Sequence, residues 1–217
     1  MKNLKLFAIT AFAAFAFGAC KTSKTSSNSG VMYQTDVVTT DDLKGMNYPL
    51  ADSIMKYSMS GNADAVLTNE MVSLSKSVTD NMFDKASVSQ FGQGVVVSFN
   101  KGNVFGVDDY TLNEETKDTL RNLAFNLSQN PQSYIVVFGR ADATGPADHN
   151  ERLAYKRAAT VANYLSGCAI NKDRLFVESF GEKYPDYKNN TSINKNKNRR
   201  VDILIIPSNE MRTNTGR

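Results

Sequence analysis

The sequence predicts an α/β sandwich, a mixed β-sheet with helices on one face, over residues 88–210. Short apolar runs typical of strands alternate there with stretches whose apolar residues recur every three or four positions, the spacing of an amphipathic helix. Glycine, proline and asparagine separate these stretches, as they do in turns. The predicted order is strand, helix, strand, helix, strand, strand, and helices that alternate with strands pack against a sheet.

A β-hairpin is expected at the start of this domain, with a helix before it. Residues 86–91 and 95–99 lie on either side of Gly92-Gln93-Gly94, and two β-prone runs around a short glycine-containing turn are typical of a hairpin. The helix before the hairpin is predicted by six apolar residues at helical spacing. They are Ala63, Val66, Leu67, Met71, Leu74 and Val78.

The next two elements are a helix and a buried strand. The helix is predicted by a single apolar stripe. The stripe consists of Leu120, Leu123, Ala124 and Leu127. It stops before Asn130-Pro131, and residues 134–138 then form a continuous apolar run that ends at Gly139. A short unbroken apolar run of this kind is expected for a strand that is covered on both faces.

A second helix and two further strands complete the domain. The apolar positions of this helix are Leu153, Ala158, Val161 and Leu165. Asn150 is available as its N-terminal cap, and Gly167 is expected to end it. Residues 175–180 and 201–206 are β-prone, and Pro207 closes the second of these runs.

Residues 1–19 predict a removable export signal. Lys2 and Lys5 precede a stretch, residues 6–19, in which 12 of 14 residues are hydrophobic, too short to span a bilayer, which takes about 20 apolar residues. The stretch ends in Phe17-Gly18-Ala19-Cys20, which resembles the lipobox of bacterial lipoproteins, although the lipobox favours Leu or Val where this chain has Phe17. The resemblance implies that Cys20 is the lipid attachment site; the alternative is an ordinary secretory signal followed by an incidental cysteine.

The segments around the predicted domain differ in composition. Residues 20–30 are small and polar and are expected to form a flexible tether. Lys21 and Lys24 follow the cysteine, where some surface-exported lipoproteins carry an acidic run, so a periplasm-facing anchor is favoured. Residues 31–87 are expected to form a helical N-terminal extension, and residues 211–217 a C-terminal tail.

The composition excludes several classes of function. The 25 basic and 22 acidic side chains give a formal charge of +3. A nucleic-acid-binding domain usually has a high pI and a clustered basic face, and a charge of +3 is too small to imply one. The chain has two cysteines and one histidine, with no C-x-x-C pair and no four-ligand zinc set, so no metal and no cofactor is expected. We recognise no serine or cysteine nucleophile beside a base, no phosphate-binding loop and no pair of acids at a catalytic spacing. We therefore do not expect an enzyme.

Five short motifs carry a resemblance to a known family. In chain order they are Gly139-Arg140-Ala141-Asp142-Ala143-Thr144-Gly145, His149-Asn150-x-x-Leu153-Ala154-x-x-Arg157-Ala158, Tyr164-Leu165, Phe180-Gly181-Glu182-x-x-Pro185 and Asn198-Arg199-Arg200-Val201-Asp202-Ile203. Together they resemble the OmpA-like C-terminal domain family. With a lipobox and a tether before the domain, the layout is similar to that of the peptidoglycan-associated lipoproteins.

The resemblance implies non-covalent binding of the peptide stem of peptidoglycan, chiefly its diaminopimelate side chain. Asp142 and Arg157 match the family's paired ligand-binding residues. Asp142 would accept charge-assisted hydrogen bonds from the ligand ammonium, and Arg157 would clamp the carboxylate bidentately, which lysine could not reproduce. Asn150 matches the family's motif asparagine and would either add a polar contact or cap the helix.

This chain departs from the family pattern at three positions. Arg140 replaces a histidine, Ala141 a threonine and Ala154 a serine. The two lost hydroxyls remove possible hydrogen bonds, each contributing about 0.5 to 1.5 kcal/mol net, and Arg140 could compensate with a contact to a carboxylate. Arg199 lies in a basic stretch and has two interpretations, a contact to anionic glycan or peptide carboxylates, or a structural arginine in a solvated loop.

The expected function is therefore that of an outer-membrane lipoprotein. Lipid on Cys20 would hold it in the membrane, and the domain would face the periplasm and bind peptidoglycan, tethering the membrane to the cell wall. The alternative is an interaction module on the same fold that has lost wall binding. In that case residues 31–87 would recruit another envelope protein.

Overall fold

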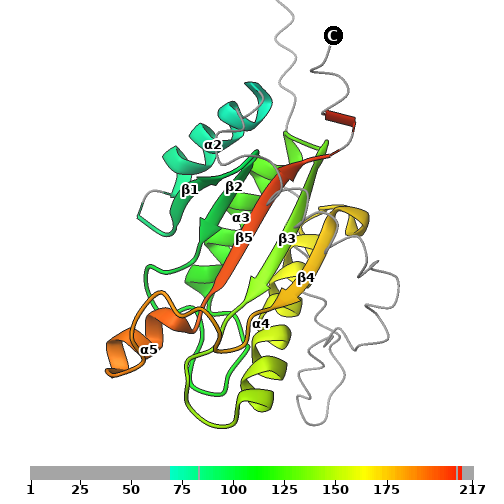
Figure 1. The fold of residues 1–217 in the computed structure, drawn as a ribbon. Helices are drawn as coiled ribbons and strands as arrows, with labels where there is room; N and C mark the ends of the chain where they lie inside the picture. The colour runs from blue at the N-terminus through cyan, green and yellow to red at the C-terminus, as the bar shows by residue number, and fades with distance from the viewer. Residues whose placement is uncertain (1–68, 83, 209, 212–217) are drawn as a thin grey trace, which may run out of the picture.

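The computed structural model describes residues 69–82, 84–208 and 210–211 (Figure 1). The predicted signal, Cys20 and the tether lie outside the described residues, as do residues 31–68 of the predicted extension. Among the described helices, none combines the length and apolar character needed to cross a membrane.

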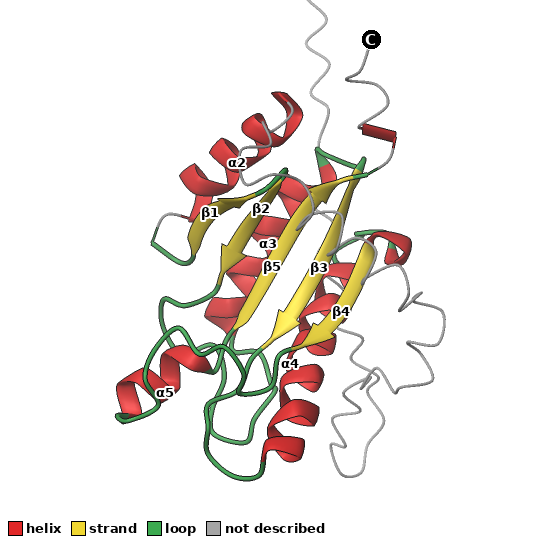
Figure 2. Ribbon diagram, viewed as in Figure 1, coloured by secondary structure: helices red, strands yellow, loops and turns green. Residues whose placement is uncertain are grey.

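A five-stranded mixed sheet forms the centre of the molecule (Figure 2). The strands are β1 (Ser87–Phe91), β2 (Gly94–Ser98), β3 (Ser133–Gly139), β4 (Leu175–Ser179) and β5 (Val201–Pro207). Their order across the sheet is β1-β2-β5-β3-β4. Only β3 and β4 pair in parallel, and the other neighbours are antiparallel. The predicted hairpin and mixed sheet are confirmed.

Helices cover one face of this sheet. They are α2 (Asn69–Met82), α3 (Glu114–Ser128) and α4 (Ala147–Gly167). A 3₁₀ turn at Lys172–Arg174 precedes β4, and a short helix, α5 (Ser192–Asn198), lies beyond the end of the sheet (Figure 1). In Figure 1, α3 and α4 lie behind the strands. Helix α5 was not predicted, because its sequence is polar and carries no apolar stripe; it begins where the Thr191 side chain accepts the Asn194 N–H.

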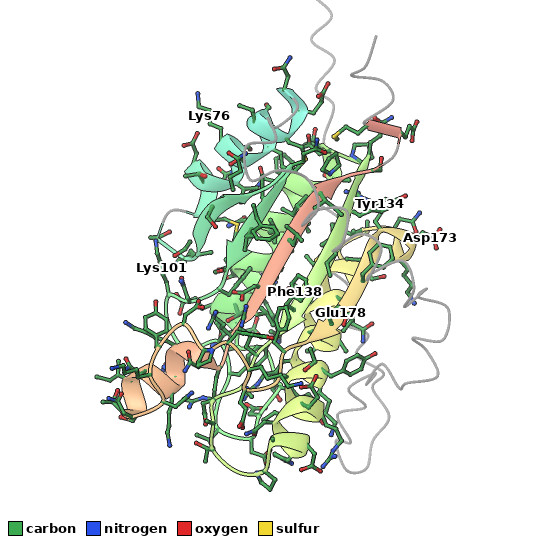
Figure 3. All side chains as sticks on the ribbon, in the orientation of Figure 1. Lys76, Lys101, Tyr134, Phe138, Asp173 and Glu178 are labelled. Atoms are coloured by element: carbon green, nitrogen blue, oxygen red, sulfur yellow. The ribbon has the colours of Figure 1, made fainter. Side chains whose placement is uncertain are left out.

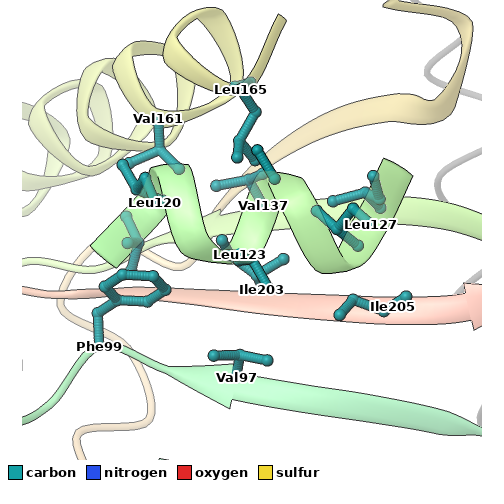
Figure 4. Close-up of a cluster of buried hydrophobic side chains, with 14 of the residues drawn as sticks. Val97, Phe99, Leu120, Leu123, Leu127, Val137, Val161, Leu165, Ile203 and Ile205 are labelled. Atoms are coloured by element: carbon teal, nitrogen blue, oxygen red, sulfur yellow. The ribbon is translucent and has the colours of Figure 1, made fainter. Parts of the chain in front are cut away.

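The main core lies between the sheet and α2, α3 and α4. Leu120, Leu123 and Leu127 of α3 are fully buried against strand residues such as Val137 and Ile203 (Figure 4). Burial of one such side chain contributes about 1.5 to 3 kcal/mol, and the periodic stripe that predicted α3 is the face that packs here. In α2, Met71, Leu74 and Val78 are buried as predicted, while Ala63, Val66 and Leu67 lie outside the described residues.

The helix ends differ in how well the sequence predicts them. Asn113 caps α3, and its side chain accepts the Thr116 N–H at 2.8 Å, an interaction that contributes about 1 kcal/mol. At α4 the prediction of an Asn150 cap is wrong. Pro146 occupies the cap position without a side-chain bond, and Asn150 lies inside the helix and is buried. Gly167 ends α4 as expected.

Candidate binding site at the carboxyl end of strand β3

The predicted binding residues gather where β3 ends and the chain turns into α4. A cavity of about 270 Å³ lies there. Its polar and charged lining includes Asp108, Asp142, His149, Asn150, Arg157 and Arg199. The structure therefore brings together four of the five residues predicted to bind a ligand, while Arg140 does not line the cavity.

Asp142 presents a buried carboxylate to this cavity. Its side chain is 5% exposed, and Oδ2 accepts a hydrogen bond from Nη1 of Arg199 at 2.8 Å. Its second oxygen, Oδ1, is buried, and no group of the described structure donates a hydrogen bond of good geometry to it. Buried polar atoms almost always have a partner, because an unsatisfied one costs about 1 to 3 kcal/mol. This oxygen therefore has no donor of good geometry in the described structure, in a residue that lines the cavity.

The surroundings of Asp142 keep it ionised. Burial on its own would raise the pKa of this carboxyl. Interactions with Thr144 and the charge of Arg199 outweigh burial, so the pKa lies below its usual range. At neutral pH the cavity wall therefore carries a negative charge.

Arg157 is buried completely on the inner side of α4. Its guanidinium donates to three backbone carbonyls, from Nε to Asp109 at 2.8 Å, from Nη1 to Arg140 at 3.0 Å and from Nη2 to Gly106 at 2.9 Å. It thereby joins the loop before α3 to the loop after β3. Three of its five N–H groups are engaged, which leaves one on Nη1 and one on Nη2.

The charge of Arg157 survives this burial. Burial lowers the pKa of the guanidinium to about 10, and the neighbouring charge of Arg199 acts in the same direction. Asp142, Asp109 and Asp108 oppose the shift. The group is still positive at neutral pH, so the guanidinium groups of Arg157 and Arg199 meet the Asp142 carboxylate in this cavity.

Arg199 lines both this cavity and a second one beside it. Besides its ion pair with Asp142, it donates from Nε to the carbonyl of Phe105 at 3.2 Å and from Nη2 to Oδ1 of Asn196 at 2.8 Å. Its side chain is 12% exposed. It also lines a second, wider cavity of about 650 Å³, which shares Val107 and Arg199 with the first. Arg199 is therefore largely buried, has three partners within the fold and lines both cavities.

Residues 104–199 match the OmpA family. These residues form an OmpA-family domain. The matched segment contains the cavity and the three charged residues at its centre, Asp142, Arg157 and Arg199. The hairpin β1–β2, which precedes the match, belongs to the same sheet.

Named relatives share this domain rather than the whole chain. The chain is 31% identical to a probable lipoprotein, YiaD, of Escherichia coli K12 over 56% of this chain and 55% of that protein. It is 32% identical to outer membrane protein A of Bordetella avium over 52% and 58%. It is 31% identical to the peptidoglycan-associated lipoprotein of Haemophilus influenzae over 45% and 63%. The chain thus spans about half to two thirds of each relative.

Two solved structures share the fold. A putative MotB-like protein from Desulfovibrio vulgaris superposes with a TM-score of 0.56 at 17% identity, over 73% of this chain and 96% of that one. The cell wall anchor of the type VI secretion system from Pseudomonas aeruginosa superposes with a TM-score of 0.55 at 21% identity, over 62% and 97%. At these identities the likeness describes the arrangement of helices and strands.

Two predicted site residues of the OmpA domain are held by other side chains. Arg140 pairs with Asp202, donates to the carbonyl of Tyr184 at 3.0 Å and stacks over Phe180 at 4.8 Å. The structure therefore gives Arg140 a partner within the fold, away from the cavity lining. Asn150 does line the cavity, and its amide donates to the carboxylate of Glu182 at 2.6 Å.

The sequence interpretation missed Asp108 at the mouth of the cavity. Its carboxylate lies 2.7 Å from Nε2 of His149, and both side chains are exposed. No signal in the sequence connects these two residues, which are 41 positions apart. Within the described residues, no group of three His, Cys, Asp or Glu side chains could hold a metal ion.

The second cysteine of the chain lies at the other end of α4. Cys168 is the C-terminal cap of this helix and packs against the main core. It is disulfide-bonded in the structure.

Proposed function

We propose that the OmpA domain of this chain binds the peptide stem of peptidoglycan non-covalently. The observation that carries the proposal is Oδ1 of Asp142, a buried carboxylate oxygen that has no hydrogen-bond donor of good geometry, in a residue that lines the cavity. A ligand ammonium would supply that donor in a charge-assisted hydrogen bond. Relatives named peptidoglycan-associated lipoprotein support this class of ligand.

The charges around the cavity suit a zwitterionic group such as the end of diaminopimelate, which carries an ammonium and a carboxylate on one carbon. Asp142 would hold the ammonium. The two unused N–H groups of Arg157 would donate to the carboxylate, and Arg199 would keep the Asp142 carboxylate ionised and oriented. Asn150, held by Glu182, would form part of the rim. We assign Arg140 to the ion pair with Asp202 rather than to the ligand.

Asp142→Asn is expected to weaken retention on purified peptidoglycan by about tenfold or more, because a charge-assisted hydrogen bond contributes about 1.5 to 3 kcal/mol. Asparagine keeps the shape of the side chain and can still accept the hydrogen bond from Arg199. Retention is measured in a co-sedimentation assay, with circular dichroism to show that the variant is folded.

Asp148→Asn is the matched control, because Asp148 is an exposed acid at the start of α4 that does not line the cavity. It removes the same charge six residues away and should leave retention unchanged. Equal retention of the wild type and Asp142→Asn would overturn the assignment of the site. It would favour an interaction module without wall binding.

We further propose that Cys20 carries a lipid that anchors the chain in the outer membrane, with the domain in the periplasm. The signal-like residues 1–19 and the small residues before Cys20 support this. Multiple acyl chains give a stable anchor where one would be marginal. Lipid at one end and the OmpA domain at the other would tether the membrane to the wall. A thioether at Cys20 would exclude that sulfur from a disulfide with Cys168.

Cys20→Ser is expected to release the protein from the membrane fraction into the soluble periplasmic fraction, since serine cannot form the thioether. Fractionation followed by immunoblotting measures the shift. Cys168→Ser is the control that separates lipid from disulfide, and it should remain in the membrane fraction. If the Cys20→Ser protein stays with the membrane, or if intact mass shows no added acyl chains on the wild type, the lipid assignment is wrong.

A further inference from the structure

The sheet has a second apolar face, opposite to the one that α3 and α4 cover. Along β3, Ile135 and Val137 belong to the main core, whereas Tyr134, Val136 and Phe138 point the other way. The second cluster consists of Val136, Phe138, Phe176, Leu204 and Ile206, with Val96, Tyr134 and Phe180 packed against it. Figure 3 labels Tyr134 and Phe138 on this face, and no described helix crosses it in Figure 1.

The side chains of this second face are buried. Val136 is 0%, Ile206 1% and Leu204 4% exposed. All members of the cluster come from strands or from Phe180 just after β4, and none comes from a described helix. Near the site, Arg140 and Tyr184 lie against Phe180. Neighbouring strand residues alone cannot close the face of a sheet.

We propose that residues 31–68 of the same chain pack across this face and cover it. The tether, residues 20–30, and the tail, residues 212–217, are polar and have little to bury. Residues 31–68 contain apolar side chains throughout, among them Val37, Val38, Leu43, Leu50, Ile54 and Met55.

The segment has the length and the starting point to reach the face. It joins the described chain at Asn69, the first residue of α2, which packs against β1. Five strands span about 20 Å at a spacing of about 4.8 Å. From 31 to 68 there are 38 residues, which extend to at most about 130 Å. The segment can therefore cross the sheet and return to the tether.

The inference has a consequence that rests on the proposed lipid anchor. If residues 31–68 were free, the chain from Cys20 to Thr68 would be a linker of 49 residues, with an r.m.s. reach of about 35 to 42 Å. With the segment docked, residues 20–30 remain, 11 residues with a reach of about 17 to 20 Å. The covered face would thus hold the OmpA domain close to the membrane.

Photo-crosslinking in the full mature chain tests the proposal directly. Tyr134→p-benzoylphenylalanine places a crosslinker on the second face in an aromatic side chain that already packs on Phe176. The expected product is an internal crosslink to a peptide from residues 31–68 in a protein of monomer size. Phe125→p-benzoylphenylalanine, on the exposed side of α3, is the control and should not crosslink to that segment. A crosslinked dimer from the Tyr134 position, or no crosslink to residues 31–68, overturns the proposal.

A second variant separates this inference from peptidoglycan binding. Replacement of Val37, Val38, Leu43, Leu50, Ile54 and Met55 by serine keeps the chain length and removes apolar side chains from the proposed cover. The melting temperature is expected to fall by about 5 °C or more, and a dye for exposed apolar surface should bind more strongly. Neither change would occur if the segment does not cover the face. Retention of this variant on peptidoglycan is measured below its melting temperature. It is expected to persist and to be lost when Asp142→Asn is added.

Discussion

Replacing Gly139 with alanine is expected to destabilise the OmpA domain by at least about 3 kcal/mol, because overpacking against atoms that cannot move falls at the upper end of core substitutions. A Cβ on Gly139 would lie 2.5 Å from the carbonyl carbon of Ala154 and closer still to its oxygen. These are backbone atoms of α4, so no side-chain rotation relieves the clash, and the helix must move away from β3. Urea unfolding followed by circular dichroism measures the loss as a lower midpoint.

Gly167→Ala is the matched control for this prediction. Gly167 is the last residue of α4, and a Cβ there would meet nothing within 4 Å. Its unfolding free energy should change by no more than about 1 kcal/mol, the difference in helix propensity. A Gly139→Ala protein as stable as Gly167→Ala would show that α4 does not pack on β3 as closely as the structure has it.

The close approach at Gly139 also positions the binding site. Helix α4 carries Asn150 and Arg157, and β3 leads into the loop that carries Asp142. A helix displaced from the strand would pull Arg157 away from the carbonyls of Gly106, Asp109 and Arg140. The close contact at Gly139 therefore sets the position of α4 in the core and, with it, the position of Arg157 in the cavity.

The sequence predicts elements well where apolar periodicity decides them. Helix α3 and strands β3 and β5 follow their stripes and runs because burial against one core selects those positions. Helix α5 has no apolar stripe, and a polar cap at Thr191 starts it instead. Asn150 has the residue type of a cap, but its partner, Glu182, lies 32 positions away. Local patterns do not contain such partners.

The site could be predicted in part for the same reason. Asp142 and Arg157 were found through motifs, whereas the three carbonyls that hold Arg157 carry no sequence signal, because every residue has a carbonyl. Arg140 lies in the first motif, in place of a histidine, which predicted a contact to a ligand carboxylate, and its actual partner, Asp202, is distant in sequence. The pairing of β3 with β5, which sets Phe138 opposite Asp202, brings that carboxylate near Arg140. Strand register, once known, would have identified the ion pair.

Arg157→Ala is expected to cost about 3 to 5 kcal/mol of unfolding free energy. The change leaves three part-buried carbonyls without their shared donor, and an unsatisfied group costs up to about 1 to 3 kcal/mol before the loops relax. Denaturant unfolding measures the loss. Arg152→Ala is the control on the same helix; its side chain is 64% exposed and pairs only with exposed Asp148 among the described residues, so its midpoint should not move measurably. A midpoint for Arg157→Ala equal to that of Arg152→Ala would contradict the structural role.

Arg157→Lys separates the structural role of this arginine from its proposed role in binding. An ammonium has three donors on one nitrogen and cannot reach carbonyls that a planar fork reaches from three nitrogens. We expect a smaller loss of stability than for alanine, so the lysine variant can be assayed while folded. If Arg157 also donates to the ligand carboxylate, retention of folded Arg157→Lys on peptidoglycan should fall about tenfold or more. If retention falls only in proportion to the unfolded fraction, Arg157 has a structural role in the cavity, and Asp142 is the only one of the two that binds a charged group of the ligand.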